Sequence, residues 1–391
     1  MDYKCVVFLM LPCFLFMVAT LTVSAATIDY YSRPHVSGHM DGLSNHHTES
    51  FSDEFAFNGR TLLEDERSDK FRSSMDRHER RDVEALLAFK KHIKTDPTGR
   101  LSNWTPENSQ QVCSWHGITC RKHTRRVVAV ILSVPVPLLN PTLGLERTLS
   151  ASLGNLSLLH TLNFSGNHLT GGIPAEFGQL KALENLDLSW NSLGGPIPKA
   201  LCNCTNLKWI ELSWNSFSGT IPEEFGRLVK LEHLDLSINN YLGGTIPSSL
   251  GNCSSLRDLS LESSNFSGQI PSSLGSLKSL SSLYLGINHF TGPLPSTLCS
   301  IKSLSSLHLE RNLLSGPIPP SIGNCTQLSG LDLYNNYVSG EIPIEMGLLH
   351  NLEYLDLLNN QLSGNIPFQL GNLSNLLSMD FGLNSLSDVI P

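Results

Sequence analysis

Leucines recur with a period of 24 residues from residue 159 to the end of the chain, and one extra residue near Tyr241 is the only slip. Each row contains the order LxxLxL, in which buried and exposed positions alternate, so it predicts a short extended segment with one apolar side. One unit cannot bury that side alone, whereas stacked units with parallel strands about 4.8 Å apart can. The rows begin at Leu159, Leu183, Leu207, Leu231, Leu256, Leu280, Leu304, Leu328, Leu352 and Leu376.

Two further columns accompany the leucines. A Gly-x-Ile-Pro column supplies a turn and a rigid extended segment. An asparagine column lies where the chain turns inward, and its amides can pair with backbone groups that would otherwise be buried without partners. Ser264 interrupts this column, so we expect its coil to be weaker and Ser264→Asn to add about 0.5–1.5 kcal/mol of stability. The column consists of Asn167, Asn191, Asn215, Asn239, Asn288, Asn312, Asn336, Asn360 and Asn384.

The N-terminal segment carries a targeting signal. A short polar start with Lys4 precedes an almost wholly apolar stretch at residues 5–23, and Ser24, Ala25 and Ala26 supply the small residues of a cleavage site. An uncleaved membrane anchor is the alternative, since a stretch of this length could just span a bilayer. We predict a signal peptide at residues 1–26, and therefore entry into the secretory pathway, where disulfides and N-glycans form.

Residues 27–81 have scattered charge and no sustained helical or strand period. We interpret them as a disordered leader. His46 and His47 are adjacent, but without further ligands at a set spacing we interpret them as part of a solvated tract rather than a metal site.

With these residues in view, the rows resemble the plant-type leucine-rich repeat, LxxLxxLxLSxNxLSGxIPxxLGNL, found in extracellular domains of plant receptor-like kinases and receptor-like proteins. The resemblance covers residues 82–391 and implies an α/β repeat fold. This fold is a right-handed leucine-rich-repeat solenoid, with short parallel strands on its concave face and an N-terminal helical cap. It further implies a cap at residues 82–126, an irregular first repeat at 127–158, and ten repeats at 159–391, of which the last is truncated. Because a solenoid needs a cap on its last coil, we expect that coil to fray and to favour self-association.

The segment "VEALLAFKKHIKTDPTGRLSNWTPENSQQVCSWHGITC" resembles the family's N-terminal cap, with an amphipathic helix at residues 82–94 and a first strand at 127–132. Cys113 and Cys120 close a short loop and are expected to form a disulfide. A metal site is the alternative, for which His116 and His123 would be the nearby ligands.

Cys299 and Cys325 fall on adjacent coils, and family members often pair cysteines in this way. The alternative is that they are buried thiols, as Cys202, Cys204 and Cys253 could also be. Eight sequons predict N-glycosylation, and five of them share one column, four residues before a row-starting leucine. The sequons are at Asn103, Asn155, Asn163, Asn203, Asn252, Asn265, Asn324 and Asn372.

Function is expected on the strand face, where side chains from every coil converge. Acidic residues recur between the leucines, but the same position is acidic in the family consensus. Tryptophans in neighbouring rows are less expected there and are typical binding anchors. Tyrosines in later rows form a second aromatic group. The candidate ligand-face residues are Trp190, Trp209, Trp214, Glu211, Asp187, Asp235, Tyr334, Tyr337 and Tyr354.

Composition and motifs narrow the class of function. The net charge of −8 gives no indication of nucleic-acid binding. Asp380, Phe381 and Gly382 spell a kinase triplet, but they fall in the repeat register and no other kinase motif precedes them. We therefore predict a non-enzyme without cofactors or a metal site, located outside the cell in the apoplast or at the outer face of the plasma membrane.

The resemblance implies a peptide or protein ligand, with a co-receptor as a further partner, and a role in signal perception during defence or development. The alternative is a secreted inhibitor of cell-wall hydrolases that resembles polygalacturonase-inhibiting proteins. An enzyme is kept only as a third hypothesis.

Overall fold

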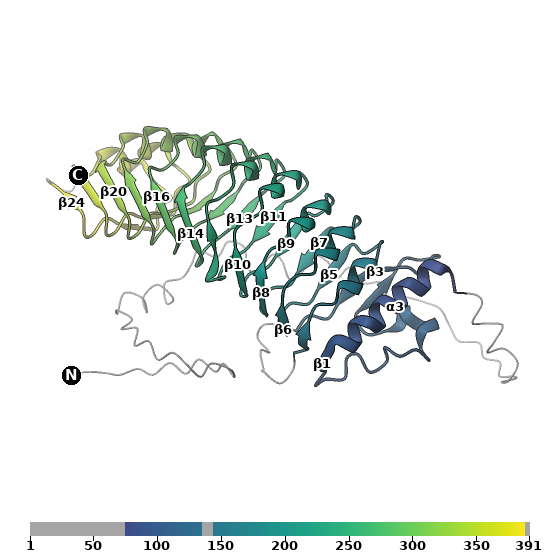
Figure 1. Cartoon of the computed structure of the whole chain (residues 1–391). Helices are drawn as coiled ribbons and strands as arrows, with labels where there is room; N and C mark the ends of the chain where they lie inside the picture. The colour runs from purple at the N-terminus through teal and green to yellow at the C-terminus, as the bar shows by residue number, and fades with distance from the viewer. Residues whose placement is uncertain (1–74, 135–143, 388–391) are drawn as a thin grey trace, which may run out of the picture. The chain divides into compact units, whose positions relative to one another are not determined.

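The computed structural model describes residues 75–134 and 144–387 (Figure 1). The predicted signal peptide and most of the predicted leader lie outside these residues. Within them, no helix combines the length and apolar character needed to cross a membrane.

One sheet of twelve strands runs along the solenoid and forms its concave sheet. Its first two strands pair antiparallel, and every later pair is parallel and in register, so that each LxL segment lies beside that of the next row. The strands are β2 (Ile118–Cys120), β3 (Val127–Ile131), β5 (Thr161–Asn163), β7 (Asn185–Asp187), β9 (Trp209–Glu211), β11 (His233–Asp235), β13 (Asp258–Ser260), β15 (Ser282–Tyr284), β17 (Ser306–His308), β19 (Gly330–Asp332), β21 (Tyr354–Asp356) and β23 (Ser378–Asp380).

A second sheet of twelve strands lies on the far side of each inward turn, and we call it the outer sheet. It starts with an antiparallel pair and continues in parallel. Its strands are β1 (Ile93–Thr95), β4 (Glu146–Thr148), β6 (His168–Gly171), β8 (Ser192–Pro196), β10 (Ser216–Gly219), β12 (Tyr241–Gly244), β14 (Asn265–Gln269), β16 (His289–Gly292), β18 (Leu313–Gly316), β20 (Tyr337–Glu341), β22 (Gln361–Gly364) and β24 (Ser385–Leu386).

Short 3-10 helices close each coil. In the regular repeats the proline of the Gly-x-Ile-Pro column is the residue just before the helix, where its missing N–H costs nothing. The helices are η1 (Ser109–Ser114), η3 (Ala151–Asn155), η4 (Ala175–Gln179), η5 (Lys199–Asn203), η6 (Glu223–Arg227), η7 (Ser248–Asn252), η8 (Ser272–Ser276), η9 (Ser296–Ser300), η10 (Pro320–Asn324), η11 (Ile344–Leu348) and η12 (Phe368–Asn372).

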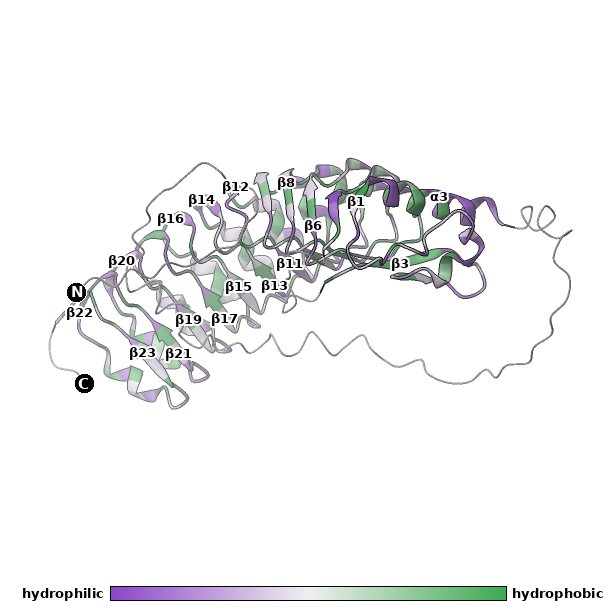
Figure 2. Cartoon of the chain, turned by 90° about the horizontal axis from the view of Figure 1, so that it is seen from below, coloured by the Kyte–Doolittle hydropathy of each residue, from purple (hydrophilic) through white to green (hydrophobic). Residues whose placement is uncertain are grey.

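The core is one continuous ladder of leucine, isoleucine and phenylalanine enclosed by the two sheets and the 3-10 helices. Leu186, Leu188 and Phe217 are typical members, each with no exposed surface. Apolar and polar residues interleave along the ribbon in Figure 2, as the row pattern predicts. β23 is the last strand of the concave sheet; Leu377 just before it and Met379 within it are 80% and 48% exposed.

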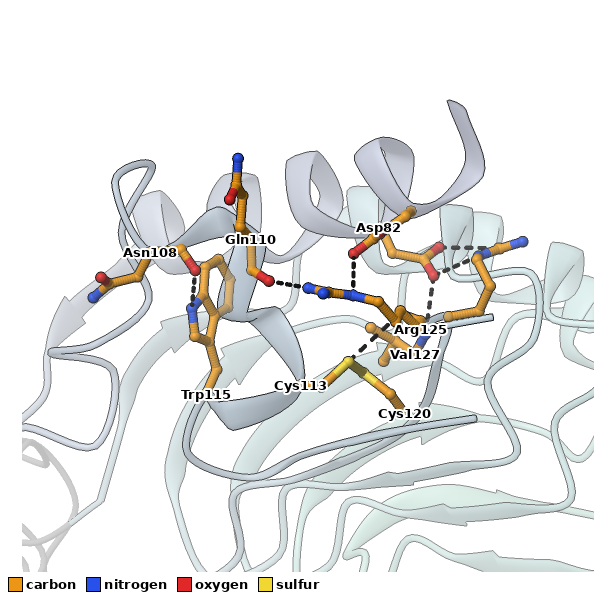
Figure 3. Close-up of a disulfide and its surroundings, with 10 residues drawn as sticks. Asp82, Asn108, Gln110, Cys113, Trp115, Cys120, Arg125 and Val127 are labelled. Atoms are coloured by element: carbon orange, nitrogen blue, oxygen red, sulfur yellow. Dashed lines mark hydrogen bonds and ion pairs between the residues drawn. A yellow bond between two sulfur atoms is a disulfide. The ribbon is translucent and has the colours of Figure 1, made fainter. Parts of the chain in front are cut away.

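A cap covers the first coil, and its single long helix is α3 (Arg77–His92), which buries Val83, Leu86 and Phe89 against the core. The helix begins five residues before the expected start at residue 82, so the predicted leader ends too late. Glu79 explains the extension, because its carboxylate lies in the first turn and pairs with Arg125 at 2.8 Å. A disulfide joins Cys113 to Cys120 below the helix (Figure 3), so these cysteines are not metal ligands.

The asparagine column forms the hydrogen bonds expected of it. Asn288, for example, accepts from Phe266 N–H and donates to the carbonyls of Leu261, Leu285 and Gly286. These bonds join neighbouring coils as well as the two ends of one turn, so each asparagine satisfies groups that the stacking would otherwise bury without partners.

Ser264 replaces asparagine without leaving a gap. Its hydroxyl accepts from Asn239 N–H and donates to Glu262 O, each at 3.3 Å. In the regular rows the column asparagine accepts from the backbone N–H 22 residues earlier, which for position 264 is Leu242 N–H. The extra residue near Tyr241 lets Leu242 N–H donate to Asn239 O instead, so this N–H already has a partner.

Ser264→Asn should therefore change the free energy of unfolding by less than about 0.5 kcal/mol, which is below our expectation from the sequence. The reverse change at a regular coil, Asn288→Ser, should cost about 1–3 kcal/mol because it leaves buried backbone groups without partners. Urea denaturation of both variants measures the two changes in the free energy of unfolding. Equal changes at positions 264 and 288 would contradict the conclusion that Ser264 leaves no backbone group without a partner.

Candidate functional site

Two positions of each strand in the concave sheet point away from the core, and in the third and fourth rows these positions carry aromatic and ionisable side chains. Trp209 and Glu211 leave β9, His233 and Asp235 leave β11, and all four are partly buried. The parallel register places Trp209 directly beside His233, and Glu211 directly beside Asp235.

Trp190 and Trp214 lie just beyond β7 and β9, where the chain turns away from the concave sheet. Their rings stack with centroids 4.0 Å apart and planes 12° from parallel. Trp214 is 43% exposed. Both residues have a positive φ, 54° and 53°, a conformation that side-chain-bearing residues adopt at some cost. The coil geometry thus holds two large aromatic rings together at the edge of the sheet.

A second stack lies on the strands themselves and forms what we call the His233 cluster: His233, Glu211, Asp235 and Asp258, with Trp209 against the imidazole. The rings of Trp209 and His233 are 3.7 Å apart and nearly parallel. His233 Nε2 lies 3.1 Å from Glu211 Oε2, and its Nδ1 lies 3.9 Å from Asp258 Oδ2.

Burial and charge shift the titration of this cluster. Burial alone would lower the pKa of His233, but the carboxylates of Asp258 and Glu211 and the other nearby negative charges outweigh it and raise the pKa to about 9. Burial, together with the charge of Glu211, raises the pKa of Asp235 to about 6. One coil away, burial also raises the pKa of Asp187, although Ser189 donates to its carboxylate.

The acidic column has a structural role at most rows. The carboxylate accepts from the backbone N–H two residues later, as Asp187 does from Ser189 at 3.1 Å and Asp235 does from Ser237 at 2.8 Å. Asp356 repeats the contact with Leu358 at 2.9 Å. This bond fixes the bend after each strand and explains why aspartate recurs there. Glu211 differs, since its longer side chain accepts instead from the hydroxyl of Ser213.

The tyrosine group predicted from the sequence is only partly brought together. Tyr334 lies two residues after β19, and Tyr354 is the first residue of β21, both in the concave sheet. The Tyr354 hydroxyl donates to Asp356 Oδ2 at 3.0 Å. Arg311 lies over the Tyr334 ring, 5.4 Å from its centroid. Tyr337 was wrongly grouped with them, because it starts β20 of the outer sheet, where it is 50% exposed.

Several residues of this surface escaped the sequence analysis. His233 and Asp258 belong to the His233 cluster, and His308 packs against Tyr284 with ring centroids 4.9 Å apart. His308 also gathers with Glu310 and Asp332 so that one ligand atom of each lies within 4.8 Å of the others. When the rows are aligned by column, these residues fall in the same or neighbouring columns of adjacent rows, so the sequence alone could have predicted that they lie close together.

The predicted glycosylation sites are distributed unequally. The five that share a column lie at the ends of 3-10 helices and are exposed: Asn155, Asn203, Asn252, Asn324 and Asn372. Asn265 on β14 is also exposed. Asn103 and Asn163 are partly buried, and the side chain of Asn163 accepts from the N–H and hydroxyl of Ser165.

The remaining cysteines of the described residues separate into one pair and three thiols. A disulfide joins Cys299 in η9 to Cys325, just after η10 on the next coil. Cys202, Cys204 and Cys253 are buried free thiols. Burial raises their pKa values, to about 12, 11 and 11 respectively, so they remain protonated near neutral pH.

Two protein families match this chain. Residues 80–121 match the family described as leucine rich repeat N-terminal domain. Seven segments match the leucine rich repeat family, at residues 158–180, 182–204, 206–228, 230–253, 255–277, 303–325 and 351–373. The chain is therefore a leucine-rich-repeat protein with an N-terminal cap.

Its relatives are plant receptor kinases and receptor-like proteins. Protein MALE DISCOVERER 2 of Arabidopsis thaliana is 36% identical over 92 residues, which cover 24% of this chain and 12% of that protein. Receptor kinase-like protein Xa21 of Oryza sativa subsp. japonica is 37% identical over 88 residues, covering 22% of this chain and 8% of that protein. The repeats are thus of the plant receptor type, and the aligned part spans about a tenth of these relatives.

Solved structures share the solenoid over a longer stretch. The crystal structure of PEPR1–AtPEP1 covers 78% of this chain and 45% of its own, with 34% identity and a TM-score of 0.68. A plant ice-binding protein covers 80% of this chain and 99% of its own, with 25% identity and a TM-score of 0.62. The same solenoid therefore serves different kinds of binding, and the function has to be argued from side chains.

Proposed function

We propose that this chain is the extracellular ligand-binding module of a plant receptor-like kinase or receptor-like protein, and that it binds a peptide or protein ligand on its concave sheet. The likeness to PEPR1–AtPEP1 supports a ligand of this class. A role in signal perception during defence or development, with a co-receptor, follows from the same family. Secretion to the apoplast or the outer face of the plasma membrane is part of the proposal.

The stacked pair Trp190–Trp214 is the observation that carries the proposal. The indole of Trp214 is 43% exposed, so it leaves apolar surface in water that a partner could bury. Tryptophan is also among the residues most enriched at binding hot spots. Trp209 lies on β9, the strand that leads to Trp214, and extends the aromatic surface into the sheet. The exposed sequons of the shared column lie on the 3-10 helices, so glycans there would leave the concave sheet open.

Replacing Trp190 and Trp214 together with alanine should weaken ligand binding at least several-fold. The pair supplies aromatic contact to a partner, while its own stacking contributes only about 0.5–1.5 kcal/mol to folding. The measurement is biosensor binding of the secreted chain to a panel of synthetic plant signalling peptides, followed by the variant on each hit.

Tyr241→Ala is the matched control, because Tyr241 is an aromatic residue that is 67% exposed on β12 of the outer sheet. It should bind like the parent. A secreted polygalacturonase forms a separate arm, and inhibition of it with no peptide hit would favour the inhibitor hypothesis instead. Unchanged affinity of the tryptophan variant, or its unfolding at a much lower temperature, would remove these residues from the ligand site.

A further inference from the structure

We propose that the His233 cluster is a binding site for one zinc-type divalent cation, held by Glu211, His233 and Asp235 on the concave sheet. This inference concerns the chain by itself and does not depend on the identity of its ligand. No metal motif is visible in the sequence at this place, because the three residues come from two different rows.

The donor atoms already converge. One ligand atom from each of Glu211, His233 and Asp235 lies within 4.8 Å of the other two. Glu211 Oε2 and His233 Nε2 are 3.1 Å apart, whereas two ligands at 2.0–2.1 Å from a tetrahedral zinc ion are separated by about 3.3 Å. An imidazole with two carboxylates suits zinc better than calcium or magnesium, which prefer oxygen ligands alone.

A second side chain or backbone group also lies against each of the three metal-binding residues. Asp258 Oδ2 lies 3.9 Å from His233 Nδ1, the ring nitrogen that does not face Glu211, which is an ion-pair rather than a hydrogen-bond distance. A carboxylate beside the second nitrogen of a metal-ligating imidazole raises the basicity of that ligand. Ser213 donates its hydroxyl to Glu211 Oε1 at 2.5 Å, and Ser237 N–H donates to Asp235 Oδ1 at 2.8 Å. Stacking on Trp209 fixes the plane of the imidazole.

The charge and the burial of the cluster favour a small cation. Three carboxylates surround one imidazole, and the lysine and arginine beside β9 and β13 are engaged elsewhere: Lys208 pairs with Glu184 at 2.8 Å and Arg257 lies 3.6 Å from Glu232. The side chains of His233 and Glu211 are only 14% and 17% exposed. A bare ion needs less space beside such largely buried side chains than a guanidinium or ammonium carried on a side chain. A fourth coordination position would face the concave surface and could take water or a group from a ligand.

The test is a calorimetric Zn²⁺ titration of the full chain in a parent that carries His46→Ala and His47→Ala, so that the adjacent leader histidines do not contribute. We expect one ion at this cluster. His233→Ala and the nearly isosteric Glu211→Gln should each remove that ion or weaken its binding at least tenfold. Asp258→Asn, which changes only the group behind the imidazole, should weaken binding by about 10–100-fold.

Two controls separate this site from others. His308→Ala disrupts the second cluster, that of His308, Glu310 and Asp332, which begins three strands further along the sheet. It should leave the His233 site intact, whether or not the second cluster takes an ion of its own. His289→Ala removes an exposed histidine of the outer sheet and should have no effect. A Zn²⁺-induced change in tryptophan fluorescence should be lost in Trp209→Phe.

Thermal unfolding in the absence of metal shows whether each variant is folded. If His233→Ala is unfolded, the Zn²⁺ affinity of Glu211→Gln tests the proposal in its place. Identical Zn²⁺ affinity and stoichiometry in the parent, Glu211→Gln and Asp258→Asn would overturn the proposal. A parent that binds no Zn²⁺ would overturn it as well, and neither result would bear on the tryptophan pair as a ligand anchor.

Discussion

Replacing Asp82 with alanine should lower the free energy of unfolding by about 3–5 kcal/mol, because it leaves a buried arginine without its counter-charge. Asp82 on α3 is fully buried and receives two bonds from the Arg126 guanidinium, at 2.7 and 3.1 Å. The same carboxylate accepts from Val127 N–H, the first residue of β3. One side chain therefore ties the capping helix to the first parallel strand; Figure 3 shows it beside the cap disulfide.

Urea denaturation followed by circular dichroism measures the effect. Lys208→Ala is the matched control, since it breaks the ion pair with Glu184 in which both side chains are substantially exposed, and such pairs contribute about 0–1 kcal/mol. Equal losses in the two variants would mean that the Asp82–Arg126 pair does not hold the cap. Hydrogen exchange should locate the damage in α3 and β3 before it reaches the central coils.

The repeat part of the fold was predictable because its cause is local and recurs. Each LxL segment specifies one strand, and the identical spacing of the rows specifies parallel register, so β5 to β23 follow from the sequence one row at a time. The cap was less predictable. The start of α3 depends on Glu79 meeting Arg125, a contact between residues that no period relates.

Ser264 illustrates the same limit within the repeats. In column alignment it is a defect, but the extra residue near Tyr241 lies in the row before it and changes which amide needs a partner. Two departures from the pattern thus compensate each other through the contact between coils, and single rows do not reveal it.

The residues of the candidate site could be predicted from the sequence only in part. The tryptophans were found because exposed aromatic residues are unusual in their columns. Their stacking and the placement of His233 between Trp209, Glu211 and Asp258 depend on the lateral register of three strands. Tyr337 was misplaced because a few residues after a strand the chain has already turned into the outer sheet.

Removing the disulfide between Cys299 and Cys325 should lower the free energy of unfolding by about 3–4 kcal/mol. The two cysteines are 26 residues apart, and a cross-link over such a loop restricts the unfolded chain to this extent in the chain-entropy model. The cap disulfide spans only 7 residues, so the double serine variant of Cys113 and Cys120 should lose less, about 2–3 kcal/mol.

The measurement compares the double variant Cys299→Ser and Cys325→Ser with the parent in urea, without reductant. Hydrogen exchange should show the loss of protection concentrated in η9 and η10, the two elements that the bond joins. Alkylation of the native protein near pH 8, with the modified cysteines located by peptide mass, provides an independent check. Cys202, Cys204 and Cys253 should resist labelling, because burial keeps their thiols protonated, and all three should react once the chain is unfolded. Labelling of Cys299 or Cys325 in the unfolded, unreduced parent would show that the bond between these coils does not form, and the double variant would then be as stable as the parent.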